Sequence, residues 1–367
     1  MDIFRLGNKE FNCINVELNQ EQGFNFPFRI LVPNNLKQNP ELIYAWTLSL
    51  GGPHGAEFLE KHASFERIQQ EANNEVSSID PIMLHLLEEG NLMIIPAIPR
   101  FSGFRPSFLG SDVYNNDFSK YDGSWYKDYL EKYKDLPDQI KNMISYSISL
   151  LREKSINVSD KVIMAGYSEG AKGTSHFALL HPEMIKAIVV GGTSGLMPVP
   201  LKELEGYTLK YPIGIANIPN FDYDSYKNIK FFYYTGENDL SDPGLPNFKE
   251  YHYINEKGED CILKDECGNL TPHLDENGNA EFLLDENGNY TAKFRLFTNE
   301  EVNILNKIYG TKVIDRFKKQ ERVISELGLD VECHIYPGNH RTVFENKKQI
   351  FSDIDSFISN RLSKKEL

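Results

Sequence analysis

The sequence predicts an α/β protein whose mostly parallel sheet is flanked by helices. Apolar runs of strand length alternate along the chain with helical stretches. Several of these runs are apolar on both faces, as strands of a covered parallel sheet are. With 367 residues, 40% of them hydrophobic, the chain is long enough to bury a large core. Length alone fits one large domain or two ordinary ones, and we expect a single domain over residues 1–367.

The expected elements follow in chain order. Runs rich in β-branched and aromatic residues predict strands over residues 26–32, 42–50, 92–98, 162–165, 187–190, 230–234 and 331–336. Helices are expected over residues 81–89, 139–154, 171–180, 313–327 and 349–362. The clearest is 139–154, where Ile140, Met143, Ile144, Ile148 and Leu151 recur three and four positions apart. This spacing places them in one stripe of a helix.

A segment with a ten-residue repeat interrupts the alternation. Asp275-Glu-Asn-Gly-Asn279 and Asp285-Glu-Asn-Gly-Asn289 have related copies at 255–259 and 265–269. The glycine of such a turn supplies the left-handed conformation that a tight hairpin needs. We therefore expect a small β-meander within residues 241–298, inserted after the predicted strand 230–234.

A calcium loop is the alternative interpretation of these repeats. The segment from Asp275 matches the EF-hand pattern at several positions, but Ala280 stands where the sharp bend requires glycine. Turns without metal are therefore favoured. The four cysteines are scattered without C-x-x-C spacing, so we expect free thiols and no metal site.

Charge and hydropathy exclude several classes of partner. The formal net charge of −14 argues against nucleic acid, because phosphate binding needs an excess of Lys and Arg. The N-terminus has no apolar signal segment, and no window reaches the ~18 apolar residues of a membrane span. We expect a soluble, cytoplasmic protein that does not bind membranes.

The stretch Ala165-Gly-Tyr-Ser-Glu-Gly-Ala171 directly follows an apolar run. It places Ser168 on a sharp turn from a strand to a helix. Such a turn strains the serine backbone, and the glycines on either side avoid clashes with the strand and the helix. The turn raises the Ser168 hydroxyl above the sheet edge, near a helix N-terminus that favours negative charge.

A serine hydroxyl needs a positioned base, which is itself oriented by a third group. Asp239 follows the strand 230–234, and His340 follows the strand 331–336. Because parallel strands end at one edge of a sheet, we expect both loops to open beside Ser168.

Other candidates for the base and the acid fit less well. His334 lies inside a predicted strand, and His252 and His273 lie in the irregular insertion, which favours His340. For the acid, Asp239 is preferred to Glu237 and Asp242 because it stands three residues after Gly236.

The glycine-rich loop Gly51-Gly-Pro-His-Gly-Ala-Glu57 follows the strand 42–50. Such a loop turns backbone N–H groups toward a developing oxyanion. We expect the N–H of Glu169 as one donor and that of Gly55 or Ala56 as the other. His54 is interpreted as a residue that fixes the loop.

Taken together, these residues make the sequence resemble the α/β-hydrolase family. The resemblance rests on the turn 166–170, the loop at His54 and the chain order Ser168, Asp239, His340. It covers residues 26–362 apart from the insertion. It implies a Ser168 nucleophile assisted by Asp239 and His340, and no cofactor. The sequence departs from the family in having its largest insertion after the acid, which leaves open the segment that covers the pocket.

We therefore expect a serine hydrolase that cleaves a carboxylic ester or related acyl bond of a small molecule through an acyl-enzyme on Ser168. Arg100 or Arg105 is placed to meet a substrate carboxylate, and Phe108 and Tyr167 are candidates for lining the pocket. A serine peptidase acting on small peptides uses the same residues and is the first alternative. A hydrolase-like protein without catalytic activity, which binds partners through the repeats 255–292, is the second alternative. Whether the protein forms a homo-oligomer stays open.

Overall fold

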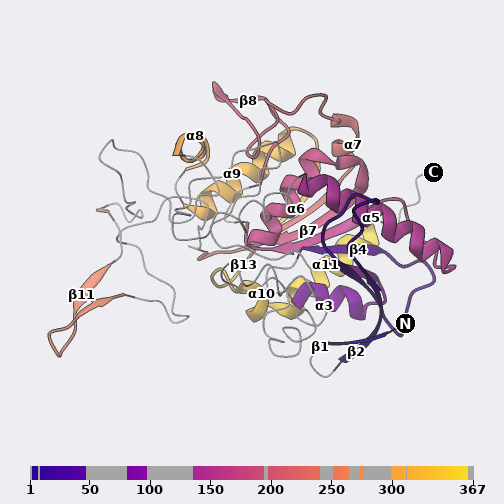
Figure 1. Cartoon of the computed structure of the whole chain (residues 1–367). Coiled ribbons are helices and arrows are strands. Elements are labelled where there is room, and N and C mark those ends of the chain that lie inside the picture. Colours follow the sequence, from indigo (N-terminus) through magenta and orange to yellow (C-terminus); the bar gives the residue numbers. More distant parts are fainter. Residues whose placement is uncertain are drawn as a thin grey trace, which may run out of the picture.

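A central sheet with helices on both faces forms the body of the molecule (Figure 1). The computed structural model describes residues 2–6, 9–46, 81–96, 135–193, 197–239, 251–263, 273, 275–276, 281, 299–310 and 312–362. Within these residues the sheet has nine strands, in the spatial order β1-β2-β3-β5-β4-β6-β7-β10-β13. The strands are β1 (Asp2–Leu6), β2 (Lys9–Val16), β3 (Phe28–Val32), β4 (Leu42–Trp46), β5 (Leu92–Pro96), β6 (Val162–Tyr167), β7 (Ile185–Gly191), β10 (Lys230–Gly236) and β13 (Asp330–Tyr336).

Most of the strand pairs are parallel. β1 with β2, β2 with β3 and β3 with β5 are antiparallel pairs. From β5 through β4, β6, β7 and β10 to β13, every pair is parallel. The predicted mostly parallel sheet is therefore confirmed, and the carboxyl ends of these parallel strands share one edge.

Two hydrophobic clusters attach the helices to opposite faces of the sheet. Along β6, Val162 and Met164 belong to the larger cluster and Ile163 and Ala165 to the smaller one, as the alternation of side chains in a strand requires. The larger cluster includes residues of α5 (Leu136–Glu153), α6 (Glu169–Leu180), α8 (Asn299–Tyr309) and α9 (Val313–Glu326). The smaller includes residues of α3 (Pro81–Glu88), α10 (Thr342–Glu345) and α11 (Lys347–Arg361). Among the described residues no helix is long and apolar enough to cross a bilayer.

The predicted helix 139–154 is confirmed as α5. The five residues of its apolar stripe, Ile140, Met143, Ile144, Ile148 and Leu151, are all buried. The helix begins earlier than expected, at Leu136, with Pro137 in its first turn. Proline is tolerated there because the first helical N–H groups have no acceptor within the helix.

Several elements were not expected from the sequence. β1 and β2 add an antiparallel ribbon at the sheet edge. In β2, buried and exposed positions do not alternate regularly and polar residues are interspersed, so its sequence shows no clear two-residue period of a strand. α8 begins directly after the predicted insertion. The short strands β8 (Glu203–Leu204) and β9 (Tyr207–Thr208) form a small hairpin, and α7 (Tyr223–Lys227) and a 3-10 turn (Pro182–Met184) are single turns.

One of the four repeats lies in the described residues and forms a hairpin. β11 (His252–Ile254) and β12 (Asp260–Ile262) pair antiparallel around the turn 255–259. Gly258 has a φ of +78° there, and the side chain of Asn255 accepts the N–H groups of Lys257 and Glu259. The predicted turn is thus confirmed at this repeat, whereas the rest of the predicted meander lies largely outside the described residues.

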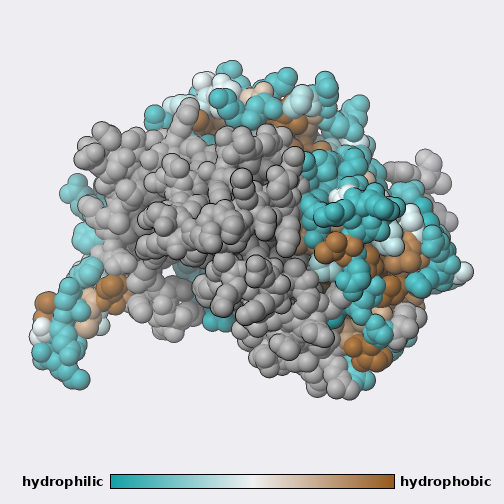
Figure 2. Space-filling view, viewed as in Figure 1, coloured by the Kyte–Doolittle hydropathy of each residue, from teal (hydrophilic) through white to brown (hydrophobic). Residues whose placement is uncertain are grey.

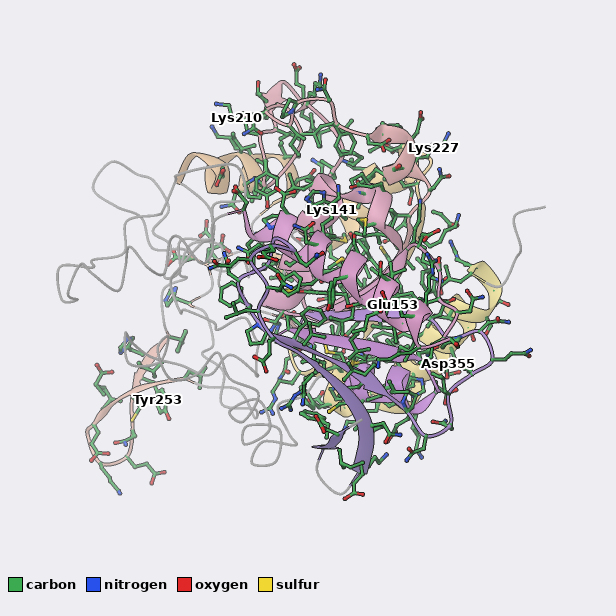
Figure 3. All side chains as sticks on the ribbon, turned by 45° about the vertical axis from the view of Figure 1, so that its right-hand side comes forward. Lys141, Glu153, Lys210, Lys227, Tyr253 and Asp355 are labelled. Atoms are coloured by element: carbon green, nitrogen blue, oxygen red, sulfur yellow. The ribbon has the colours of Figure 1, made fainter. Side chains whose placement is uncertain are left out.

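The β11–β12 hairpin stands away from the body of the molecule (Figure 1). Figure 2 shows apolar residues on its surface, where Ile254 is 67% exposed. Tyr253, labelled in Figure 3, lies on the same hairpin and is also exposed.

An ion-pair cluster ties α5 to the segment between α6 and β7 and yields a prediction on stability. Nζ of Lys141, a residue labelled in Figure 3, lies 2.8 Å from Oε1 of Glu183, and Nδ1 of His181 lies 3.4 Å from the same oxygen. Burial by itself raises the pKa of Glu183, but hydrogen bonds from His181 and Lys141 outweigh it and lower the pKa to about 2. The charged carboxylate therefore stabilises the fold above its ordinary pKa of 4.5, and this stabilisation is lost as the pH falls toward 2.

We expect Glu183→Gln to lower the free energy of unfolding at pH 7 by about 1 kcal/mol, since solvent screens a pair this exposed. Urea unfolding at pH 7, 5 and 3 measures the effect, and the difference from wild type should shrink between pH 5 and pH 3. The exposed Glu326 on α9 gives the control, because Glu326→Gln should change stability little at any of these values. An undiminished difference at pH 3 would contradict the assignment.

Candidate active site

Ser168 lies between the end of β6 and the start of α6, in a strained backbone conformation. Its φ is 56° and its ψ is −116°, in a region that residues with a side chain rarely adopt. The Ser168 N–H donates to the carbonyl oxygen of Gly191 at 2.8 Å, and the Ser168 carbonyl accepts the N–H of Lys172 at 3.2 Å. These bonds to the neighbouring strand and the following helix stabilise the turn that the sequence predicts.

Gly166 shows why this turn needs a residue without a side chain. A Cβ at this position would lie 2.5 Å from the carbonyl oxygen of Gly170 and 2.9 Å from the backbone nitrogen of Ala171. Both neighbours belong to the backbone of the turn and α6, so they cannot rotate away as a flexible side chain does. The steric reason that the sequence predicts for the glycine at position 166 is confirmed.

The loops that follow β10 and β13 pack against each other. The N–H of Glu237 donates to the carbonyl of Tyr336, and the N–H of Asn238 donates to the carbonyl of Gly338, both at 2.9 Å. A Cβ on Gly236 would overlap the carbonyl oxygen of Asn339, so the two backbones touch at this point. The close contact brings the loop with Asp239 and the loop with His340 together.

An unbroken chain of polar contacts joins the three side chains that the sequence analysis grouped. Nε2 of His340 lies 3.0 Å from Oγ of Ser168. Nδ1 of His340 lies 3.1 Å from Oδ1 and 3.0 Å from Oδ2 of Asp239. Because a carboxylate only accepts, we place the proton of the neutral imidazole on Nδ1, and Nε2 then accepts the proton of the Ser168 hydroxyl.

Asp239 is sealed from solvent at the end of this chain. Its side chain is 0% exposed, whereas that of His340 is 17% exposed. A buried carboxylate needs compensating partners, and besides His340 the Thr235 hydroxyl donates to Oδ2 at 3.4 Å. The Asp239 N–H donates to the carbonyl of Gly236, which fixes the start of the turn.

The competing histidines and acids make other contacts or lie outside the described residues. His334 lies within β13 and pairs with Glu332, and His252 lies on the β11–β12 hairpin and pairs with Asp260. Glu237 is exposed. Asp242 lies outside the described residues, and His273 contacts Glu281 and the ring of Tyr251.

The remaining predicted site residues are placed only in part. Glu169, whose N–H is a predicted oxyanion donor, is the first residue of α6, where helical N–H groups have no acceptor four residues back. Tyr167 lies with its ring centroid 5.3 Å from that of His340. The predicted residues Gly55, Ala56, Arg100, Arg105 and Phe108 lie outside the described residues.

Sequence reasoning missed three residues that support this arrangement. Thr235 contacts Asp239, Tyr234 stacks on Tyr167, and Gly192 lies against both Tyr167 and His340. The adjacent pair Gly191 and Gly192 at the end of β7 was the signal in the sequence. Two glycines directly after a buried strand indicate a close approach by neighbouring groups.

Comparisons with known proteins give weak structural matches to esterases, an alpha/beta hydrolase and peptidases. No protein-family model and no curated protein matches the chain. Among solved structures, an acetyl xylan esterase from Aspergillus awamori is 17% identical, with a TM-score of 0.35 over 63% of this chain and 74% of the esterase. An alpha/beta hydrolase enzyme from a Medee basin deep-sea metagenome library is 12% identical, with a TM-score of 0.39 over 98% of this chain and 99% of that one.

Peptidases also appear among the matches. A prolyl endopeptidase is 14% identical, with a TM-score of 0.32 over 62% of this chain and 30% of the endopeptidase. All three TM-scores lie below 0.5, so these matches add no argument about function. The fold is assigned from the chain itself, namely from the mostly parallel sheet, the sharp turn at Ser168 and the chain order of serine, aspartate and histidine after the parallel strands β6, β10 and β13.

Proposed function

Since the chain has the α/β-hydrolase fold, we propose that it is a serine hydrolase that cleaves a carboxylic ester or related acyl bond through an acyl-enzyme on Ser168. The observation that supports this most directly is the continuous contact from Ser168 through His340 to the buried Asp239. It unites a weak nucleophile, a base and an orienting acid, which is what nucleophilic catalysis by serine requires.

In the first step, the Ser168 oxygen bonds to the carbonyl carbon while Nε2 of His340 takes the hydroxyl proton. The tetrahedral intermediate then collapses, the bond to the leaving alcohol breaks, and His340 gives its proton to the alcohol oxygen. Water repeats the sequence on the acyl-enzyme. His340 takes a proton from the water, the hydroxyl adds to the carbonyl, and the proton returns to Ser168 as the acid leaves.

Asp239 acts through His340 in each step. Its carboxylate accepts the Nδ1 proton, which keeps Nε2 free to act as the base, and its negative charge stabilises the imidazolium that forms. Complete burial of the carboxylate strengthens this interaction, because bulk water does not screen it.

Negative charge on the substrate oxygen needs its own donors. We assign the Glu169 N–H at the start of α6 as one donor, where the helix dipole also favours an anion. The second donor in this proposal is the N–H of Gly55 or Ala56. Loss of one such donor costs about 3 kcal/mol of transition-state stabilisation.

A fluorophosphonate probe tests the proposal directly, because it labels only an activated serine. We expect one probe per chain on the wild type, attached to Ser168 in a peptide map, and none on Ser168→Ala. Ser159, which lies in the loop before β6 and whose hydroxyl accepts the N–H of Lys161, serves as the control through Ser159→Ala. An unlabelled wild type would refute a serine hydrolase and would favour a silent binding protein.

The preferred bond is decided by a matched substrate panel. We expect hydrolysis of short p-nitrophenyl esters, with amides of the same acyl groups cleaved far more slowly. If the amides are instead cleaved faster than the esters, the same residues serve a peptidase acting on small peptides.

A further inference from the structure

Two tyrosines flank a glycine in the sheet, next to the turn at Ser168. Tyr167 of β6 and Tyr234 of β10 both lie in register with Gly191 of β7. Residues directly opposite one another in neighbouring strands point to the same face, so both rings rise beside a position that has no side chain. Their centroids lie 6.4 Å apart, with the planes inclined by 22°. A Cβ on Gly191 would overlap the ring of Tyr234, so the glycine provides the space for this stack.

A second, tilted ring contact joins Tyr167 to the candidate base. The rings of Tyr167 and His340 lie with centroids 5.3 Å apart and planes inclined by 39°. Gly192, with a φ of +63°, lies where they meet, because a Cβ there would be 3.0 Å from Cε1 of His340 and 3.0 Å from Cε2 of Tyr167. The Gly192 N–H donates to the carbonyl of Tyr234 at 3.1 Å, which attaches this backbone to β10.

Hydrogen bonds alone leave one motion of the imidazole weakly restrained. The contacts to Ser168 and Asp239 hold the two nitrogen ends of the His340 ring. A rocking motion about the line between these ends changes the two hydrogen-bond lengths little, so the bonds resist it weakly. A ring packed against the face of the imidazole resists this motion through van der Waals contact.

We propose that Tyr167 is a positioning residue, whose ring fixes the orientation of the His340 imidazole. Tyr234 supports this ring beside Gly191, and Gly192 lies where the Tyr167 and His340 rings meet. The inference rests on the proposed function and deepens it. It gives Tyr167 a role through His340 in place of direct contact with substrate. A misplacement of about 1 Å in a reacting group costs roughly 100-fold in rate, so a loose imidazole is expected to slow the chemical step.

The first test compares two substitutions of the same tyrosine. Tyr167→Leu removes the aromatic face and is expected to lower kcat for ester hydrolysis by about 10- to 100-fold, with KM within about threefold of wild type. Tyr167→Phe keeps the face and is expected to restore kcat to within about threefold. A residue that binds substrate equally in the ground and transition states would instead raise KM and leave kcat unchanged.

The second test uses two glycines with similar positive φ values. Gly192 and Gly328 have φ values of +63° and +71°, but nothing lies within 4 Å of a Cβ at Gly328. Gly192→Ala and Gly328→Ala therefore introduce similar backbone strain, and only the first presses on the two rings. We expect Gly192→Ala to reduce kcat at least about tenfold more than Gly328→Ala. If Tyr167→Leu fails to fold, as judged by circular dichroism, this pair of variants tests the positioning role of Tyr167.

The outcomes separate this inference from the proposed function. Ser168→Ala, assayed in parallel, reports on the function alone, and activity retained there would remove the basis of both. With Ser168→Ala inactive, wild-type kcat in Tyr167→Leu, or equal losses in Tyr167→Leu and Tyr167→Phe, would overturn the positioning role only. A rise in KM at unchanged kcat would return Tyr167 to the substrate-binding role.

Discussion

Ser168→Ala is expected to lower kcat for ester hydrolysis by about 10⁴- to 10⁶-fold, because no oxygen remains to form the acyl-enzyme. His340→Ala should cost a similar factor, since nothing then accepts the Ser168 proton across the 3.0 Å contact. Both residues act in the same step, so the double variant should be no slower than the slower single variant. Steady-state hydrolysis of a short p-nitrophenyl ester measures all three.

His334→Ala provides the control for the histidine. His334 lies on β13 six residues before His340, pairs with Glu332 and stacks on Phe232, so its loss should leave kcat within about threefold of wild type. The residual rate of the Ser168 and His340 variants would come from the backbone donors and substrate binding. Losses that simply multiply in the double variant would mean that the two side chains act in separate steps, contrary to the mechanism.

Asp239→Asn is the second large effect, with an expected loss of about 10⁴-fold in kcat. An amide at this buried position presents N–H groups toward Nδ1 of His340. The imidazole then places its proton on Nε2, where it can no longer accept the proton of Ser168. The substitution changes the volume of the side chain little, so the fold should be kept, and thermal unfolding checks this.

Two further variants serve as comparisons for Asp239→Asn. Glu237→Gln alters an exposed carboxylate two residues away and should leave kcat unchanged. Thr235→Val removes the 3.4 Å hydrogen bond to Asp239, which is long and therefore weak, and should cost less than about tenfold. Activity that survives Asp239→Asn and disappears in Glu237→Gln would show that Glu237, and not Asp239, is the orienting acid.

The grouping of Ser168, Asp239 and His340 was predictable because it depends on local rules. Each residue follows a parallel strand of the sheet, namely β6, β10 or β13, and parallel strands deliver their following loops to one edge. The glycine before Ser168 indicated a strained turn, and the structure shows the clash that any side chain at Gly166 would cause. Neither inference needed knowledge of how distant strands align.

The stack of Tyr167 and Tyr234 could not be predicted in this way. It depends on both tyrosines lying in register with Gly191, and no local pattern reveals the register between strands that are far apart in sequence. β1 and β2 were missed for a related reason, since their burial depends on pairing with each other and with β3. For the predicted loop around Gly55 and for Arg100, Arg105 and Phe108, which lie outside the described residues, the predictions stand as made.

If the proposed mechanism holds, the position of β13 at one edge of the described sheet makes activity depend on the pairing of this strand. Ser168 and Asp239 follow β6 and β10, which lie in the interior of the sheet order, whereas His340 follows the edge strand β13, which pairs with β10. If β13 separated from β10 while the interior strands stayed paired, Ser168 would lose its contact with His340. Under the proposed mechanism, hydrolysis would then be lost before the whole chain unfolds, and a folding chain would become active only after β13 had paired with β10.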